Sequence, residues 1–179
     1  MTQIAATYAQ ALYDLTKDEN LTEEILAQLQ ALQGSISAEP DFVRLLSTPG
    51  ISKEERCGIV DASFRDKVHT YVLSFMKILV EKGYMRYFAD CCKAYKTFYN
   101  EDHGILPVLA VTAVVLTDTQ KQKLTAKLES ITGKTVELEN RVDSTVLGGV
   151  RLDYDGKRVD GTVKNRLDSI GSLLKNTVL

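Results

Sequence analysis

The sequence predicts an α + α/β protein, in which a six-helix bundle precedes a small α/β domain. Apolar residues recur at helical spacing through residues 1–104, and the pattern changes after Gly104 to β-branched runs and short alternations. The charge changes as well: residues 1–104 carry 11 basic and 15 acidic side chains, whereas residues 105–179 carry 11 and 9. We therefore place the boundary near residues 103–107, with domains at 1–104 and 105–179.

Start signals for the first four helices can be found in the sequence. The first helix is expected over residues 3–17, and Asn20 is expected to N-cap the second. Pro40 suits the start of a short third helix, because its missing N–H is not needed there. Ser52 and Glu55 have the spacing of a capping box and open the fourth helix.

The fifth and sixth helices are predicted from their ends and their apolar faces. The fifth spans residues 67–82 and stops at Gly83, since glycine readily adopts the left-handed conformation that follows a helix. The sixth is closed by His103 and Gly104. Short loops between such helices favour a compact bundle. The apolar residues expected on buried faces of the second, fourth and sixth helices are Ile25, Leu29, Leu32, Ile36, Ile59, Val60, Phe64, Tyr84, Phe88, Cys91, Tyr95 and Phe98.

The second domain is expected to begin with a buried strand over residues 108–116, which are mostly β-branched and aliphatic. Thr117 and Gln120 form another capping box, and the helix that they open ends at Gly133. The apolar residues on one face of this helix are Leu124, Leu128 and Ile131.

Alternating residues predict further strands after this helix. They occupy residues 136–139 and 150–154, and Asp155-Gly156 supplies a dipeptide favoured in tight hairpin turns. Residues 163–174 carry apolar side chains at helical spacing and complete the domain. The predicted order is strand, helix, strand, strand, short strand, helix.

Composition excludes several classes of protein. The net charge of −2, from 22 basic and 24 acidic side chains, argues against a nucleic-acid binder, which needs a basic surplus. Three cysteines without a framework pattern favour a reducing compartment. The N-terminal residues lack the features of a secretory signal peptide, and the longest apolar stretch is far shorter than the roughly 20 residues that span a bilayer. We expect a soluble cytosolic protein that reaches a membrane only through a partner.

Apparent chemical motifs fail on their spacing or context. Gly133-Lys134-Thr135 resembles the end of a phosphate-binding loop, but Leu128 occupies the position of the required glycine. Gly148-Gly149 lacks the spacing of a dinucleotide fingerprint and indicates a bend or a close backbone approach by another chain.

Metal sites are not predicted either. Asp155 and Gly156 fit a hairpin turn better than a calcium loop, whose first and last positions would hold Arg151 and Thr162 instead of carboxylates. His69 and His103 have no ligand partner at helical spacing. The sequence therefore predicts no catalytic residue, metal or cofactor.

The predicted first and fifth helices carry more apolar surface than the edge of a bundle requires. One interpretation is that both helices are central in the bundle. The other is that they form a groove for an amphipathic helix of another protein, where alanines of the first helix permit close approach. Their polar residues form one narrow stripe each: Gln3, Thr7, Gln10, Asp14 and Lys17 in the first, and Thr70, Ser74, Lys77 and Glu81 in the fifth.

Short motifs along nearly the whole chain match one family in order. They are Tyr8-Ala9-Gln10-Ala11-Leu12; Leu46 with Pro49 and Ile51; Thr112-Ala113 with Leu116 and Gln120; Gly133-Lys134 with Val136-Glu137-Leu138; Val142-Asp143 with Leu147-Gly148-Gly149; and Asp160-Gly161-Thr162-Val163-Lys164-Asn165-Arg166-Leu167. On these segments the sequence resembles the delta subunit of bacterial F-type ATP synthase and its mitochondrial counterpart, the oligomycin-sensitivity-conferring protein.

The resemblance implies a non-catalytic stator subunit of the proton-translocating ATP synthase, one copy per complex, at the cytoplasmic face of the cell membrane. It implies that the first and fifth helices hold the N-terminal helix of an alpha subunit of the catalytic head. The second domain would meet the b subunits of the peripheral stalk, with Gly149 as the expected contact. The residues that would line the groove are Tyr8, Ala11, Leu15, Phe75, Ile78 and Leu79.

Two alternatives remain open from the sequence. One is a helical adaptor of an unrelated complex, which would bind an amphipathic helix but not the catalytic head. The other is an enzyme with a site between the domains, which would show a polar pocket with convergent ionisable groups.

Overall fold

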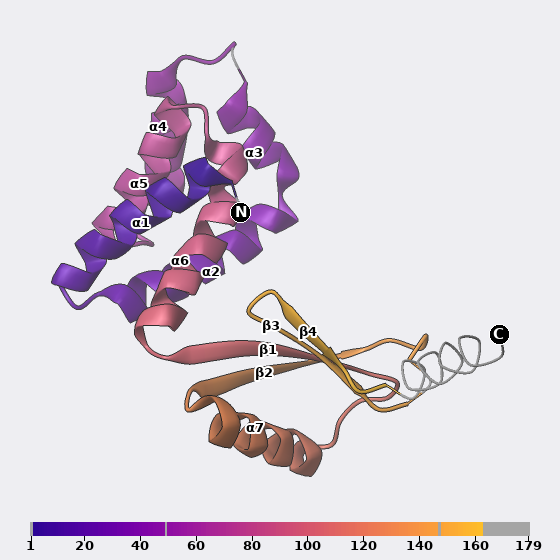
Figure 1. The fold of residues 1–179 in the computed structure, drawn as a ribbon. Coiled ribbons are helices and arrows are strands. Elements are labelled where there is room, and N and C mark those ends of the chain that lie inside the picture. The colour runs from indigo at the N-terminus through magenta and orange to yellow at the C-terminus, as the bar shows by residue number, and fades with distance from the viewer. Residues whose placement is uncertain (1, 49, 147, 163–179) are drawn as a thin grey trace, which may run out of the picture. The chain divides into compact units, whose positions relative to one another are not determined.

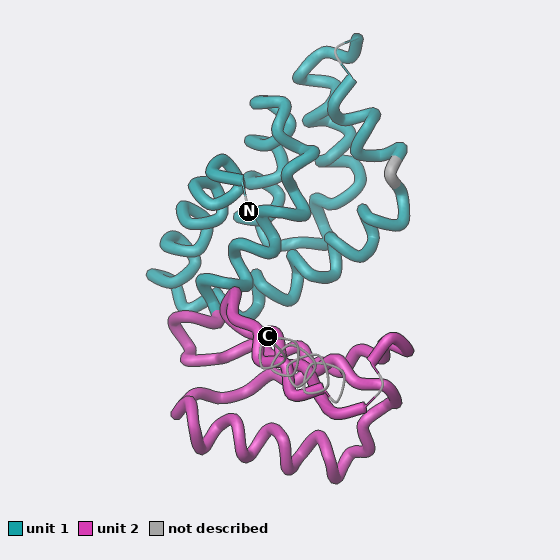
Figure 2. The backbone as a smooth tube through the Cα atoms, turned by 45° about the vertical axis from the view of Figure 1, so that its right-hand side comes forward, with its two compact units in different colours: residues 1–99 teal, residues 100–179 magenta. Residues whose placement is uncertain are grey.

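The computed structural model describes all residues except 1, 49, 147 and 163–179, so the helix expected over residues 163–174 lies outside the described residues. The chain divides into two compact units, residues 1–99 and 100–179 (Figure 2). The division falls in the last turn of the sixth helix, slightly before the boundary expected near residues 103–107.

Helices make up the first unit, and each helix expected from the sequence has a counterpart (Figure 1). A short 3-10 turn, η1 (Met85–Tyr87), leads into the sixth. The helices are α1 (Gln3–Asp18), α2 (Thr22–Ala38), α3 (Pro40–Ser47), α4 (Lys53–Phe64), α5 (Thr70–Glu81) and α6 (Phe88–Asp102).

The connection between α1 and α2 corrects one prediction. Asn20 does not N-cap α2, because it lies in the left-handed region with φ 58°. The Asn20 N–H donates to the Lys17 carbonyl at 3.1 Å, and the Leu21 N–H donates to the Thr16 carbonyl at 2.9 Å. These two bonds close α1 in a Schellman motif with asparagine in the position that glycine often takes. Helix α2 then starts at Thr22 without a side-chain cap.

Other helix ends follow local side-chain chemistry. The capping box of Ser52 and Glu55 is confirmed at the start of α4. The expected start of α5 at Lys67 is wrong: the helix begins at Thr70, because the His69 ring accepts a hydrogen bond from the Tyr71 N–H at 3.2 Å. Gly83 ends α5 with φ 71°, as predicted.

The first unit has one large apolar core, to which α1, α2, α5 and α6 contribute most. A buried polar pair crosses it: the hydroxyl oxygens of Thr16 and Tyr95 lie 2.6 Å apart, and both residues are fully buried. Because unpaired buried hydroxyls are costly, this bond fixes how α6 packs on the end of α1. The largest fully buried side chains here are Tyr95, Phe88, Ile25, Leu29, Leu46, Met76, Leu79 and Met85.

The second unit contains a four-stranded sheet in the order β2-β1-β3-β4 and one described helix (Figure 1). Strands β1 and β2 are parallel, so α7 forms the crossover between them, while β3 and β4 form an antiparallel hairpin beside β1. The elements are β1 (Ile105–Thr112), α7 (Asp118–Thr132), β2 (Thr135–Val142), β3 (Val150–Tyr154) and β4 (Lys157–Asp160).

The first strand differs from the prediction of a buried strand over residues 108–116. Strand β1 ends at Thr112, and Val114 and Val115 are 72% and 68% exposed. The side chain of Asn140 accepts a hydrogen bond from the Leu116 N–H at 2.8 Å and donates to the Thr112 hydroxyl at 2.9 Å. After Thr112 the backbone therefore bonds to a side chain instead of a neighbouring strand, and residues 113–116 leave the sheet.

Turn and cap predictions in this unit are confirmed. Thr117 and Gln120 form the capping box of α7, and Gly133 ends it with φ 67°. In the hairpin turn Asp155 and Gly156 have φ values of 47° and 68°, as a tight turn with two left-handed residues requires.

The core of the second unit is small. Ile131 does not contribute to it, since 68% of its side chain is exposed although the spacing placed it with Leu124 and Leu128. The core cluster comprises Leu106, Val108 and Val136, with Leu128, Leu138, Leu152 and Tyr154 packed against it.

Candidate functional site

Helices α1 and α5 are joined at both ends. The Tyr71 hydroxyl, at the start of α5, donates to the Glu19 carboxylate, which follows the end of α1, at 2.5 Å. At the other end the rings of Tyr8 and Tyr84 meet edge to face, with centroids 5.9 Å apart. Tyr8 lies early in α1 and Tyr84 follows α5, so the two helices run antiparallel, side by side.

Both helices carry apolar side chains that the rest of the unit leaves exposed or half-buried. Ala11 is exposed, and Leu15 and Ile78 are 44% and 43% exposed, while Tyr8 is half-buried beside them. We call these four residues the α1/α5 strip. Exposed apolar side chains that gather on one surface can mark a place where a partner binds.

Two of the six residues predicted to line a groove lie in the core instead. Phe75 is 6% exposed and Leu79 is fully buried, and both belong to the core cluster of the first unit. The two interpretations of the apolar excess therefore apply to different residues. Phe75 and Leu79 act as core residues of a central helix, whereas Ala11, Leu15 and Ile78 face outward.

Polar contacts flank the strip on both helices. On α1 the Gln10 side-chain amide donates to the Asp14 carboxylate at 2.7 Å. On α5 the Lys77 ammonium donates to Asp61 of α4 at 2.8 Å, and this hydrogen bond is the main reason that the pKa of Asp61 is lowered.

Gly149, the predicted stalk contact, is in a crowded place within its own unit. Its φ is +83°, and a Cβ atom added there would lie 2.6 Å from the Gly161 carbonyl oxygen and 3.0 Å from the Thr162 Cα. The Gly161 N–H also donates to the Val150 carbonyl at 3.0 Å. The chain itself therefore requires glycine at position 149, whether or not a partner approaches it.

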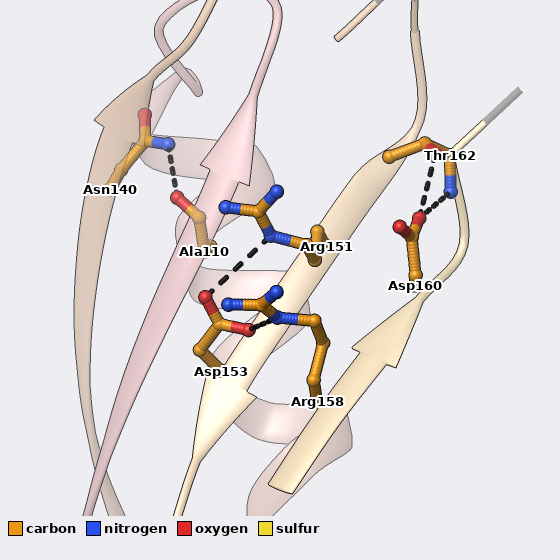
Figure 3. Close-up of polar contacts among 7 residues, drawn as sticks. All are labelled: Ala110, Asn140, Arg151, Asp153, Arg158, Asp160 and Thr162. Carbon is orange, nitrogen blue, oxygen red and sulfur yellow. Dashed lines mark hydrogen bonds and ion pairs between the residues drawn. The ribbon is translucent and has the colours of Figure 1, made fainter. Parts of the chain in front are cut away.

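A set of polar contacts holds the neighbouring strands (Figure 3). The Asp153 carboxylate accepts a hydrogen bond from Arg158 at 2.7 Å and pairs with Arg151 at 3.6 Å. Asp160 accepts hydrogen bonds from the Thr162 hydroxyl at 2.6 Å and the Thr162 N–H at 2.9 Å. The hydrogen bond from Arg158 lowers the pKa of Asp153, and the hydroxyl bond from Thr162 lowers that of Asp160.

The cysteines are poorly suited to nucleophilic chemistry. Burial raises the pKa of Cys91 to about 11 and that of Cys92 to about 12, and burial also raises the pKa of Cys57. Their thiolates are therefore scarce at neutral pH. Among the described residues, no three His, Cys, Asp or Glu side chains are grouped as a metal site would require. None of the described helices combines the length and apolar character needed to cross a membrane.

Sequence reasoning missed the contacts that join the helix ends. Glu19 and Tyr71 are 52 residues apart, and no local motif marks either of them. Tyr84 was expected on the buried face of the sixth helix, but it precedes η1 and meets Tyr8 instead. The only available signal is that Glu19 and Tyr84 each lie two residues beyond a predicted helix end.

Exposed apolar side chains on a helical unit mark a surface that can bind another protein. The family model described as "ATP synthase delta (OSCP) subunit" matches residues 4–174. The chain belongs to the ATP synthase delta (OSCP) subunit family. It is accordingly a non-catalytic stator subunit of an F-type ATP synthase, part of the peripheral stalk.

Individual relatives agree with this assignment. The chain is 33% identical to ATP synthase subunit delta of Clostridioides difficile (strain 630) over 176 residues, which cover 98% of this chain and 97% of the relative. It is 32% identical to ATP synthase subunit delta of Alkaliphilus oremlandii, with 98% of each chain covered. A chain of the Toxoplasma gondii mitochondrial ATP synthase hexamer has a similar fold, with a TM-score of 0.76, 19% identity, and coverage of 97% of this chain and 98% of that one.

Proposed function

We propose that this chain links the catalytic head of a proton-translocating ATP synthase to the peripheral stalk through two separate attachments. Residues 1–104 act as a six-helix bundle that binds the N-terminal helix of an alpha subunit. Residues 105–179 act as an α/β domain that binds the b subunits. One copy works in each complex, at the cytoplasmic face of the cell membrane. The observation that carries the proposal is the exposed α1/α5 strip.

The strip suits an amphipathic helix as its partner. Ala11 has a small side chain, so a second helix can approach α1 closely, while Leu15 and Ile78 supply exposed apolar area. Each 100 Å² of apolar surface that the partner covers contributes about 2.5 kcal/mol. Phe75 and Leu79 support this surface from the core. Such an attachment is hardly weakened by salt, because it does not rest mainly on charge.

Two attachments on one chain explain how a stator can resist torque. The turning shaft drags on the catalytic head, and a static link must hold the head against it. Once one unit is bound, the other is held near its own partner at a raised effective concentration. Neither attachment therefore needs extreme affinity.

For the stalk attachment, Gly149 remains the predicted contact position in the second unit. Support comes from its exposure and from the tight turn that it makes beside Gly161.

A peptide titration of the full chain tests the head attachment. The probe is a synthetic peptide of the alpha-subunit N-terminus from the same organism, and calorimetry reports affinity, stoichiometry and heat capacity. We expect one-to-one binding with a negative heat-capacity change, because apolar surface is buried. Ala11→Asp should weaken binding by about 10- to 100-fold, since a carboxylate would be covered without a partner.

Ala31→Asp provides the matched control. Ala31 is an exposed alanine in the interior of α2, so the same substitution tests helix propensity and added charge away from the α1/α5 strip. Its affinity for the peptide should equal that of the unmodified chain. Equal affinity of the Ala11→Asp variant and the unmodified chain would contradict binding at the strip.

A further inference from the structure

The start of α5 is capped by a ring nitrogen. The Nδ1 atom of His69 accepts a hydrogen bond from the Tyr71 N–H at 3.2 Å, and the His69 carbonyl accepts the first helical bond, from the Leu73 N–H at 3.1 Å. Such an N-cap satisfies one of the N–H groups that the first turn leaves without a partner. The residues usual at this position, such as serine and asparagine, accept through an oxygen atom that takes up no proton near neutral pH.

His69 can accept this bond in one protonation state only. Because Nδ1 is the acceptor, the single ring proton of the neutral side chain lies on Nε2. A second proton can therefore bind only at Nδ1, which then becomes a donor and faces the Tyr71 N–H. The charged ring would also lie at the positive end of the α5 dipole. Protonation of His69 thus removes the cap of α5.

The same residue lies in a series of contacts between three helices. Its backbone N–H donates to the Gln28 side chain of α2 at 2.6 Å, and its ring lies against the Tyr71 ring, with centroids 4.9 Å apart. The Tyr71 hydroxyl in turn donates to Glu19, beyond the end of α1. A released first turn of α5 therefore also loosens the bond that joins α5 to the end of α1.

The charged groups around the cap do not oppose a positive charge on His69. Among the described residues none of them forms an ion pair with its ring, and acidic side chains outnumber basic ones. Two of the acids already accept hydrogen bonds, Glu24 from the Gln28 amide at 3.0 Å and Glu19 from Tyr71. The charged residues of the neighbouring segments are Asp18, Glu19, Glu23, Glu24, Arg65, Asp66 and Lys67.

We propose that His69 is an acid-sensitive cap, which releases the first turn of α5 when its ring is protonated. An unperturbed histidine changes its charge near pH 6.5, so the cap is present at about pH 7.5 and is lost as the pH falls below about 6. Because the release also weakens the joint between α5 and α1, a fall in pH loosens the attachment of the partner helix. This consequence rests on the proposed function, whereas the cap itself does not.

Amide exchange of the full chain, recorded by NMR at about pH 7.5 and about pH 5.5, tests the cap. After correction for the intrinsic exchange rate at each pH, protection of the Tyr71 and Leu73 amides should fall about 2- to 30-fold in acid, as expected for the loss of an N-cap. His69→Asn should show no fall, because an amide oxygen accepts the bond at both pH values. His69→Ala should show the low protection at both.

His103→Asn is the matched control, because His69 and His103 are the only histidines of the chain. It should keep the fall in protection. Protection at Tyr71 that does not change with pH in the unmodified chain, or that falls equally in His69→Asn, overturns the proposed cap.

Calorimetry with the alpha-subunit peptide tests the consequence for binding. In acid the affinity of the unmodified chain should fall by at least about twofold relative to that of His69→Asn, which is the lower limit for the loss of a cap. Equal affinities of the two proteins at the lower pH overturn this consequence. A peptide that binds at neither pH overturns the proposed function instead, and the exchange experiment still decides whether His69 is an acid-sensitive cap.

Discussion

Replacement of Gly149 by alanine tests the close approach in the second unit. The added methyl group would lie 2.6 Å from the Gly161 carbonyl oxygen, and the backbone would hold alanine at φ +83°. Both effects act within the chain, so no partner is needed to observe them. Gly133→Ala is the matched control, because Gly133 has φ +67° and no atom within 4 Å of an added Cβ.

The two substitutions should differ by the cost of the steric overlap. Holding alanine in the left-handed region costs about 1–2 kcal/mol at either position. Forcing a methyl group into filled space adds about 1–3 kcal/mol at Gly149 alone. We therefore expect a loss of about 2–5 kcal/mol for Gly149→Ala and about 1–2 kcal/mol for Gly133→Ala, because only the first must displace backbone atoms.

Native-state hydrogen exchange of the full chain separates the two units in one experiment. Amides in the ladder between β1 and β3, such as those of the paired residues Ala110 and Leu152, report on the second unit. Amides of α2 and α6 report on the first unit and should not change. Exchange in the ladder should become faster in Gly149→Ala than in Gly133→Ala by about 5- to 150-fold.

Equal exchange rates in the two alanine variants would refute the steric reasoning. The expected result also affects how stalk binding is tested. If Gly149→Ala destabilises the second unit, its loss of binding to b subunits would not by itself show that Gly149 contacts them. A binding experiment at this position needs the exchange data beside it.

Two further predictions concern stability. Asp153→Asn should make the stability of the second unit less sensitive to acid. The folded-state pKa of Asp153 lies below its unfolded value near 3.9. The ionised carboxylate therefore stabilises the fold fully above about pH 4, and this stabilisation is lost as the pH falls through the folded-state pKa. Hydrogen exchange in the β1–β3 ladder, measured from about pH 5 to about pH 2, tests this. The same acid dependence in the variant and the unmodified chain would show that the Arg158 contact does not matter. Tyr95→Phe should destabilise the first unit by about 1–2 kcal/mol in urea unfolding, because the Thr16 hydroxyl and the Thr22 carbonyl both lose the hydrogen bond to the Tyr95 hydroxyl. Tyr71→Phe removes only an exposed bond and should cost much less. Equal losses of unfolding free energy in Tyr95→Phe and Tyr71→Phe would contradict this account.

Helix ends were predictable where the signal is confined to a few residues. The capping boxes of Ser52 and Thr117 depend on a side chain and a backbone N–H three residues apart, and both are present. Asn20 shows the limit of such signals. Asparagine suits an N-cap and also the left-handed residue after a helix, and only the bonds back to Thr16 and Lys17 decide between them.

The end of β1 could not be predicted, because it depends on Asn140, which lies 28 positions after Thr112. The valines after Thr112 favour a strand by their own preference. Asn140, on the neighbouring β2, binds the Leu116 N–H and the Thr112 hydroxyl and draws this segment out of the sheet. An isolated sequence pattern does not show which strand will lie beside it.

The candidate site was predictable as a pair of helices but not residue by residue. The spacing of apolar residues shows how wide the apolar sector of α1 and of α5 is. It does not show which part of that sector the other helices bury. In the structure Phe75 and Leu79 are covered, and Ala11, Leu15 and Ile78 are not. This division decides which variants can separate folding from binding. Substitution of Phe75 or Leu79 would disturb the core first, so any loss of binding would be ambiguous, whereas a change at Ala11 or Ile78 alters a surface that the chain leaves open.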